Sequence, residues 1–191
     1  MQKNIWVAGL LGGMAMFAWL FVSNAVLPVK SNMIHQVVPN QFDVHQALKQ
    51  NITRPGTYSC LYLTRDEESK MPNYRDQPIY SITYEGSTHG DTGSKAEFLP
   101  LLWVFGATTV ASWMLSLTSV RARSSYWRRV LFVALIGLLV ALSDDLLQMS
   151  FGPQPKDYLT FLAVNHLIAW TLAGLAIAAY MKPDPGVATR R

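Results

Sequence analysis

The stretch "VLFVALIGLLVALSDDLLQMSFGPQPKDYLTFLAVNHLIAWTLAGLAIAAYM", Val130–Met181, holds two long apolar runs joined by a short polar turn. The runs, Val130–Phe151 and Tyr158–Met181, each reach the roughly 20 residues that span a bilayer core. A turn this short makes the two segments antiparallel neighbours. The stretch therefore predicts a helical hairpin that crosses a membrane twice.

Two further runs of the same length occur earlier, Ile5–Leu27 and Phe98–Val120. Of the 191 residues 50% are hydrophobic and 15% are charged, whereas a soluble domain carries about 25% charge. The sequence predicts an all-α membrane protein with four transmembrane helices and a small α+β extracytoplasmic segment between the first two. We expect an anchor helix (residues 1–28), an outer segment (29–97), a three-helix region (98–181) and a tail (182–191).

The formal net charge is +4, and the basic residues gather at the ends of the apolar runs, which disfavours nucleic acid as a partner. Under the positive-inside rule, basic segments stay in the cytoplasm. Both termini and the loop after the second run are then cytoplasmic, and the outer segment and hairpin turn lie outside. The compact loops and the lack of a transit peptide favour a bacterial inner membrane. The basic residues concerned are Lys3, Arg121, Arg123, Arg128, Arg129, Lys182, Arg190 and Arg191.

The first run has one alternative interpretation. Ser23-Asn24-Ala25 resembles a signal-peptidase site, but the apolar cores of signal peptides run about 7–15 residues. This run is longer, so the sequence favours an uncleaved anchor helix.

The outer segment predicts one helix and two strands. In "VVPNQFDVHQALKQNITRPGTY", Asn40 is a predicted N-cap with Asp43 as its partner. Strands are predicted at Thr57–Leu63 and Pro78–Gly86, with a long charged loop between them. The predicted apolar face of the helix consists of Phe42, Val44, Ala47 and Leu48.

So small a segment buries little core by itself, and we expect it to rest on the helices or on a partner subunit. The lone Cys60 has no internal disulfide partner and is expected to be a small buried strand residue. The lead Gly86–Lys95 and the tail "KPDPGVATRR" are expected to be flexible.

Small residues at four-residue spacing let membrane helices approach closely. Gly9 and Gly13 in the first run, and Ala169 and Ala173 in the last, are the predicted packing positions. Aromatic residues near the predicted boundaries fit an interfacial belt; they are Trp6, Trp103, Trp127, Tyr126, Tyr158 and Tyr180.

Polar residues interrupt the hairpin on both sides of its turn. Asp145 lies six residues before Phe151, about 9 Å of helix, and His166 lies eight after Tyr158, about 12 Å. Both therefore lie at one depth, and Ser23 and Asn24 reach a similar depth. Asp144 and Asp145 point about 100° apart, so at most one faces His166 directly. The predicted intramembrane polar cluster comprises Asp144, Asp145, Gln148, Asn165, His166 and Asn24.

The cluster has three interpretations. In the first, it fixes the register of the helices or a contact with another subunit, because lipid does not satisfy polar groups. In the second, it handles protons or cations. In the third, it binds a ligand or a lipid headgroup. Catalytic motifs and metal-ligand spacings are absent from the sequence, with His35, His45 and His89 outside the spans. We expect no catalytic residue, no metal and no cofactor.

The preferred prediction is a non-catalytic accessory, scaffold or assembly subunit of a larger, energy-converting membrane complex, with the lipid bilayer and other membrane subunits as its partners. One alternative is a small proton- or cation-coupled transporter or channel subunit that uses Asp144, Asp145 and His166. The other is a redox subunit that binds haem or quinone near His166, with a partner supplying the second haem ligand.

Overall fold

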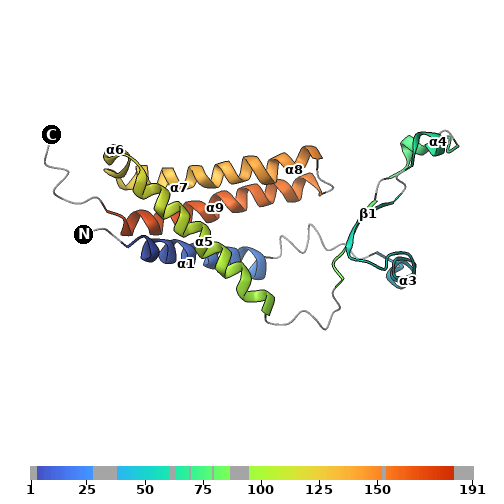
Figure 1. Ribbon diagram of the computed structural model, residues 1–191, viewed down its shortest axis with the longest axis horizontal. Coiled ribbons are helices and arrows are strands. Elements are labelled where there is room, and N and C mark those ends of the chain that lie inside the picture. The colour runs from blue at the N-terminus through green and yellow to red at the C-terminus, as the bar shows by residue number, and fades with distance from the viewer. Residues whose placement is uncertain are drawn as a thin grey trace. The chain divides into compact units, whose positions relative to one another are not determined.

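The computed structural model describes residues 4–27, 38–60, 63–68, 70–78, 80–86, 95–151 and 154–182, and for 95–98 the backbone alone. The chain divides into two compact units (Figure 1). A helical unit comprises Met1–Gln36 and Ser94–Arg191, and an outer unit comprises Val37–Gly93. Some of the sequence predictions concern residues outside these ranges. They are the predictions for Lys3, most of the lead before the second span, residues 152–153 of the turn and the tail from residue 183.

The predicted fold class is confirmed at the level of a mostly helical chain with a small two-stranded sheet. Among the described residues, four helical segments are long and apolar enough to cross a membrane; they are Ile5–Val26, Leu99–Leu117, Tyr126–Phe151 and Lys156–Tyr180. The first consists of α1 (Ile5–Phe21) and the π-helical turn η1 (Val22–Val26). The second lies within α5 (Lys95–Leu117), and the fourth is α9 (Lys156–Tyr180).

The third segment is continuous but changes its helical type. It consists of α7 (Tyr126–Val140), the π-helical turn η3 (Ala141–Asp145) and α8 (Leu146–Phe151). It begins at Tyr126 rather than at the predicted Val130, because a helix continues through residues too polar to extend an apolar run. Arg128 and Arg129 therefore lie in its first turn, and the short helix α6 (Val120–Arg123) precedes it.

Helix α1 packs against both α5 and α9, and α9 also packs against α7 (Figure 1). The glycines of α1 allow these contacts. A Cβ on Gly9 would meet the Thr109 backbone of α5 at 2.7 Å, and one on Gly12 would meet Ile177 of α9 at 2.6 Å. Gly13 similarly faces Phe105. Each glycine thus lies where another backbone or side chain approaches too closely for any larger residue.

The contact between α7 and α9 follows the same rule. Gly137 of α7 faces Trp170, and Gly174 of α9 faces Val133. Ala169 and Ala173 are buried, at 1% and 0% exposure. They belong to the core, whose other members include Ala8, Met16, Leu115 and Ile177.

A buried arginine fixes the end of the helical unit where α6 meets α7. Arg129, 3% exposed, donates from Nε to the carbonyl oxygen of Ala178 at 3.2 Å and from its guanidinium to the carbonyl oxygen of Arg123. Carbonyls in the last turn of a helix have no intrahelical partner, so a guanidinium is well placed there. The Tyr126 hydroxyl adds a bond to the Leu175 carbonyl at 3.2 Å.

In the outer unit, α3 (Gln41–Asn51) precedes an antiparallel ribbon of β1 (Gly56–Cys60) and β2 (Tyr80–Tyr84). Between the strands lie α4 (Arg65–Glu68) and the 3₁₀ turn η2 (Tyr74–Asp76), where the sequence predicted only a loop. The signal for α4 was in "TRDE", because Glu67 accepts hydrogen bonds from the Thr64 backbone N–H at 2.9 Å and from its hydroxyl at 2.7 Å. The bond from the Thr64 N–H to the Glu67 carboxylate is one half of the capping-box pattern.

Three details of the outer unit differ from the prediction. Asn40 lies at the N-cap of α3 but makes no side-chain capping bond. Phe42 and Val44 do not share a face, since two residues turn a helix by about 200°, and Phe42 is 81% exposed. Cys60 lies on β1 as expected, but it is exposed because no described segment of the outer unit covers it.

Candidate functional site: a polar cluster on the helical hairpin

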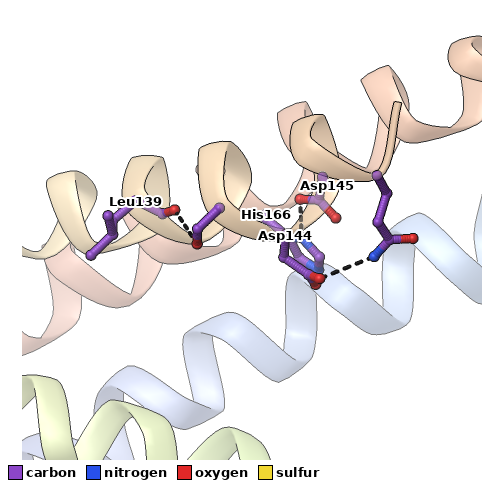
Figure 2. Close-up of polar contacts among 6 residues, drawn as sticks. Leu139, Asp144, Asp145 and His166 are labelled. Atoms are coloured by element: carbon purple, nitrogen blue, oxygen red, sulfur yellow. Dashed lines mark hydrogen bonds and ion pairs between the residues drawn. The ribbon is translucent and has the colours of Figure 1, made fainter. Parts of the chain in front are cut away.

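The cluster centres on one contact between the two arms of the hairpin. His166 Nδ1 of α9 and Asp145 Oδ2 of η3 lie 2.7 Å apart, as Figure 2 shows. The Asp145 side chain is 2% exposed and that of His166 is 32% exposed. The carboxylate is thus enclosed, while one side of the imidazole remains open.

The π-helical turn η3 determines which aspartate points inward. Its wide turn ends with the Leu146 N–H bonded to the Ala141 carbonyl, five residues back. Ser143 donates to the Leu139 carbonyl at 2.7 Å, a side-chain bond that competes with regular helix pairing (Figure 2). Single π turns within α-helices occur often at functional sites.

Asp144 has a different environment from Asp145. It is exposed, and its Oδ1 accepts a hydrogen bond from Gln148 Nε2 at 3.0 Å, one helical turn further along (Figure 2). The two carboxylates therefore belong to separate contacts, one inside the hairpin and one on its surface.

Asn165 joins a different pair of helices. It is 4% exposed, and its Oδ1 accepts a hydrogen bond from Trp19 Nε1 of α1 at 2.7 Å. The sequence prediction grouped Asn165 with the aspartates and did not include Trp19. A signal for Trp19 was available, because a tryptophan within an apolar run needs an acceptor for its indole N–H.

Asn24 makes no hydrogen bond to the other residues of the predicted cluster, although the sequence prediction included it among them. Its amide donates to the Leu20 carbonyl at 2.8 Å, and Ser23, 1% exposed, donates to the same carbonyl at 3.2 Å. The π-helical turn η1 carries both residues and leaves backbone acceptors for short polar side chains.

The chemistry available to the cluster is proton exchange or hydrogen bonding. An imidazole bonded to a carboxylate through Nδ1 keeps Nε2 as its second polar atom. Within the described residues, no three His, Cys, Asp or Glu side chains group as metal ligands.

A shallow hollow lies on the outer unit, between α4 and η2. Its lining includes Arg65 and Arg75 together with Glu68 and Asp76. The opposite charges balance, so the hollow has no clear preference for a charged ligand.

Comparison with protein-family models, with curated proteins and with solved structures finds no match to this chain.

Proposed function

We propose that this protein is a non-catalytic accessory or scaffold subunit of a larger, energy-converting complex in a bacterial inner membrane. It crosses the membrane four times, and the outer unit binds a partner protein outside the cytoplasm. The observation that carries the proposal is a partly uncovered apolar face on the ribbon of the outer unit.

The register of the ribbon separates its side chains into two chemical faces. Tyr58 pairs with Ile82 and Cys60 with Tyr80, whereas Thr57 pairs with Thr83 and Ser59 with Ser81. Side chains alternate along a strand, so one face is aromatic and apolar and the other carries only hydroxyls. Such a pattern is typical of a ribbon whose apolar face packs on another surface.

Within the outer unit this apolar face is only partly covered. Tyr58 and Ile82 at its centre are half-buried, whereas Tyr80 is 58% exposed and Tyr84 is 38% exposed. None of the described residues from 38 to 86 falls in the buried class. An isolated two-stranded ribbon is marginally stable in water, so a covering partner explains both the pattern and the exposure. The open ribbon edges also offer backbone pairing to a partner strand.

Charge and aromatic placement support the membrane orientation. The described basic residues Arg121, Arg123, Arg128 and Arg129 lie around α6 and the start of α7, with Lys182 just after α9. Asp144 and Asp157 lie toward the opposite ends of their helices. By the positive-inside rule the arginine end is cytoplasmic. Trp6 and Trp127 are 75% and 68% exposed near helix starts, as interfacial tryptophans are.

The test is capture of a stoichiometric partner from native membranes in mild detergent, identified by mass spectrometry. Tyr80→Ser with Tyr84→Ser removes large apolar groups from this apolar face, and we expect the partner to be lost. Ser81→Ala with Thr83→Ala alters the other face of the same strand and should retain it. A protein that runs alone under all these conditions contradicts the proposal.

A second function has one specific observation in its favour. The open side of His166, next to a buried carboxylate, suits proton or cation transfer. In reconstituted vesicles with a pH-sensitive dye, Asp145→Asn would then abolish flux that Asp157→Asn leaves intact. In the described part of the helical unit His166 is the sole histidine, so no comparable observation favours the haem alternative.

A further inference from the structure

Asp144 is an exposed carboxylate within a helix long enough to span the membrane. It lies seven residues before the end of α8 at Phe151, about 10 Å of helix rise. Exposed apolar residues lie on the same side of the helix, three and seven positions further along: Leu147 is 52% exposed and Phe151 is 85% exposed. In a bilayer the carboxylate would therefore lie on a lipid-facing surface below the headgroups.

The contacts of Asp144 within the chain do not neutralise it. Its partner in the structure is the neutral amide of Gln148. The adjacent Asp145, in contrast, lies against the imidazole of His166. The chain thus provides an imidazole partner for one aspartate and leaves the adjacent one facing outward.

An exposed intramembrane carboxylate is unfavourable by several kcal/mol unless something pairs with it or hydrates it. Gln148 lies one helical turn closer to Phe151 on the same side of the helix, and its amide extends the polar surface that begins at Asp144. A carboxylate and an amide on adjacent turns offer hydrogen-bonding groups to another transmembrane helix that packs against this lipid-facing surface. We define Asp144 and Gln148 as the polar strip.

We propose that the polar strip is the docking point for a transmembrane helix of a partner subunit that carries an arginine or lysine at the same depth. The inference rests on the proposed accessory function and specifies the partner's chemistry within the membrane. Charge complementarity selects the basic side chain, because an interhelical salt bridge both neutralises the carboxylate and occupies the amide.

A second copy of this chain does not fit the strip. A twofold contact centred on the strip would bring Asp144 against its own copy, and like charges repel. The described spans hold their basic residues at the ends: Arg128 and Arg129 begin α7, and Lys156 begins α9. Neither end lies at the depth of Asp144.

The test is site-specific photocrosslinking in native membranes from a photoreactive amino acid at position 147. We expect one protein adduct, whose crosslinked peptide maps to a membrane helix with an arginine or lysine within one turn. Asp144→Asn should lower the adduct yield at least about tenfold, since truncating one member of a buried charge pair removes most of the affinity. Asp144→Glu, which keeps the charge, should retain most of the yield, and Asp157→Asn is the matched control.

Three results would overturn the inference: adducts with lipid alone, an adduct with a second copy of this chain, or a yield that Asp144→Asn leaves unchanged. A different result contradicts the proposed accessory function: no partner protein is captured from native membranes under any condition. If the Tyr80/Tyr84 variant loses its partner while position 147 shows no protein adduct, the accessory function stands and the docking point does not.

Discussion

Asp144 and Asp145 carry the same side chain, yet one is exposed and the other is 2% exposed. The difference comes from helix rotation, which turns adjacent positions about 100° apart, and from the wide turn of η3 that directs Asp145 toward His166. The sequence placed both aspartates and His166 at one depth. It did not say which aspartate faces inward, because the position of a π turn depends on packing rather than on local residue preference.

Removing the imidazole should destabilise the helical unit. His166→Ala leaves the Asp145 carboxylate buried without its partner, which costs about 3–5 kcal/mol at fully buried pairs. Because His166 is 32% exposed, we expect about 2–3 kcal/mol in detergent-solubilised protein unfolded with denaturant. Asp144→Asn should leave the free energy of unfolding within about 0.5 kcal/mol of wild type. Equal effects of the two changes would contradict the assignment of the pair.

Trp19→Phe should also weaken the structure, by about 1–2 kcal/mol, because Asn165 Oδ1 remains buried without its donor. Replacing both, as Trp19→Phe with Asn165→Leu, removes donor and acceptor together and should cost less than the sum of the two single changes. The same unfolding assay measures both. Additive losses would indicate that the two side chains do not interact.

At the level of elements, the apolar runs predicted the four long helices because each run is continuous and long enough to leave one interpretation. The glycine spacing in α1 also indicated close packing, but not that Gly9 and Gly12 serve two different neighbours. The outer unit was harder to predict. Its short elements depend on local caps such as Thr64 with Glu67, which a charged, loop-like composition conceals.

The side of α1 that faces α5 can be tested with a single added methyl group. Gly9→Ala places a Cβ against the Thr109 backbone, and we expect a loss of about 1–3 kcal/mol from overpacking. Gly106 of α5 has nothing within 4 Å of its would-be Cβ. Gly106→Ala should therefore be neutral or stabilising by up to about 1 kcal/mol. The comparison is made by thermal unfolding of both purified variants.

The start of α4 should be sensitive to acid. Hydrogen bonds from the Thr64 backbone N–H and then its hydroxyl hold the pKa of Glu67 below its usual value. Because this pKa is lower in the folded protein than in the unfolded chain, ionised Glu67 stabilises the start of α4. The stabilisation is fully present at pH values above the pKa of Glu67 in the unfolded chain, and it is lost as the pH falls through the pKa in the folded protein. NMR should show the Thr64 amide resonance shifting over that acidic range. Thr64→Val removes the hydroxyl and should raise the pKa of Glu67, and an unchanged titration would contradict the capping role.

At the level of the whole molecule, the single cysteine reports orientation. Cys60 is exposed in the outer unit, so a membrane-impermeant maleimide should label it in spheroplasts with an intact inner membrane. In a Cys60→Ser background, Ser124→Cys lies exposed between α6 and α7 and should react only after permeabilisation. The reverse pattern would show that the positive-inside prediction is wrong for this chain.

The position of α1 between α5 and α9 has a consequence for biosynthesis. Trp19 precedes its partner Asn165 by 146 positions. At about 5–20 residues per second, the ribosome needs roughly 7–30 s to cover that interval. During this time the first helix made lacks the last helix that packs against it. Chains released before α9 is complete leave the Gly12 side of α1 without its native neighbour, and these are the products that membrane quality-control proteases would be expected to remove.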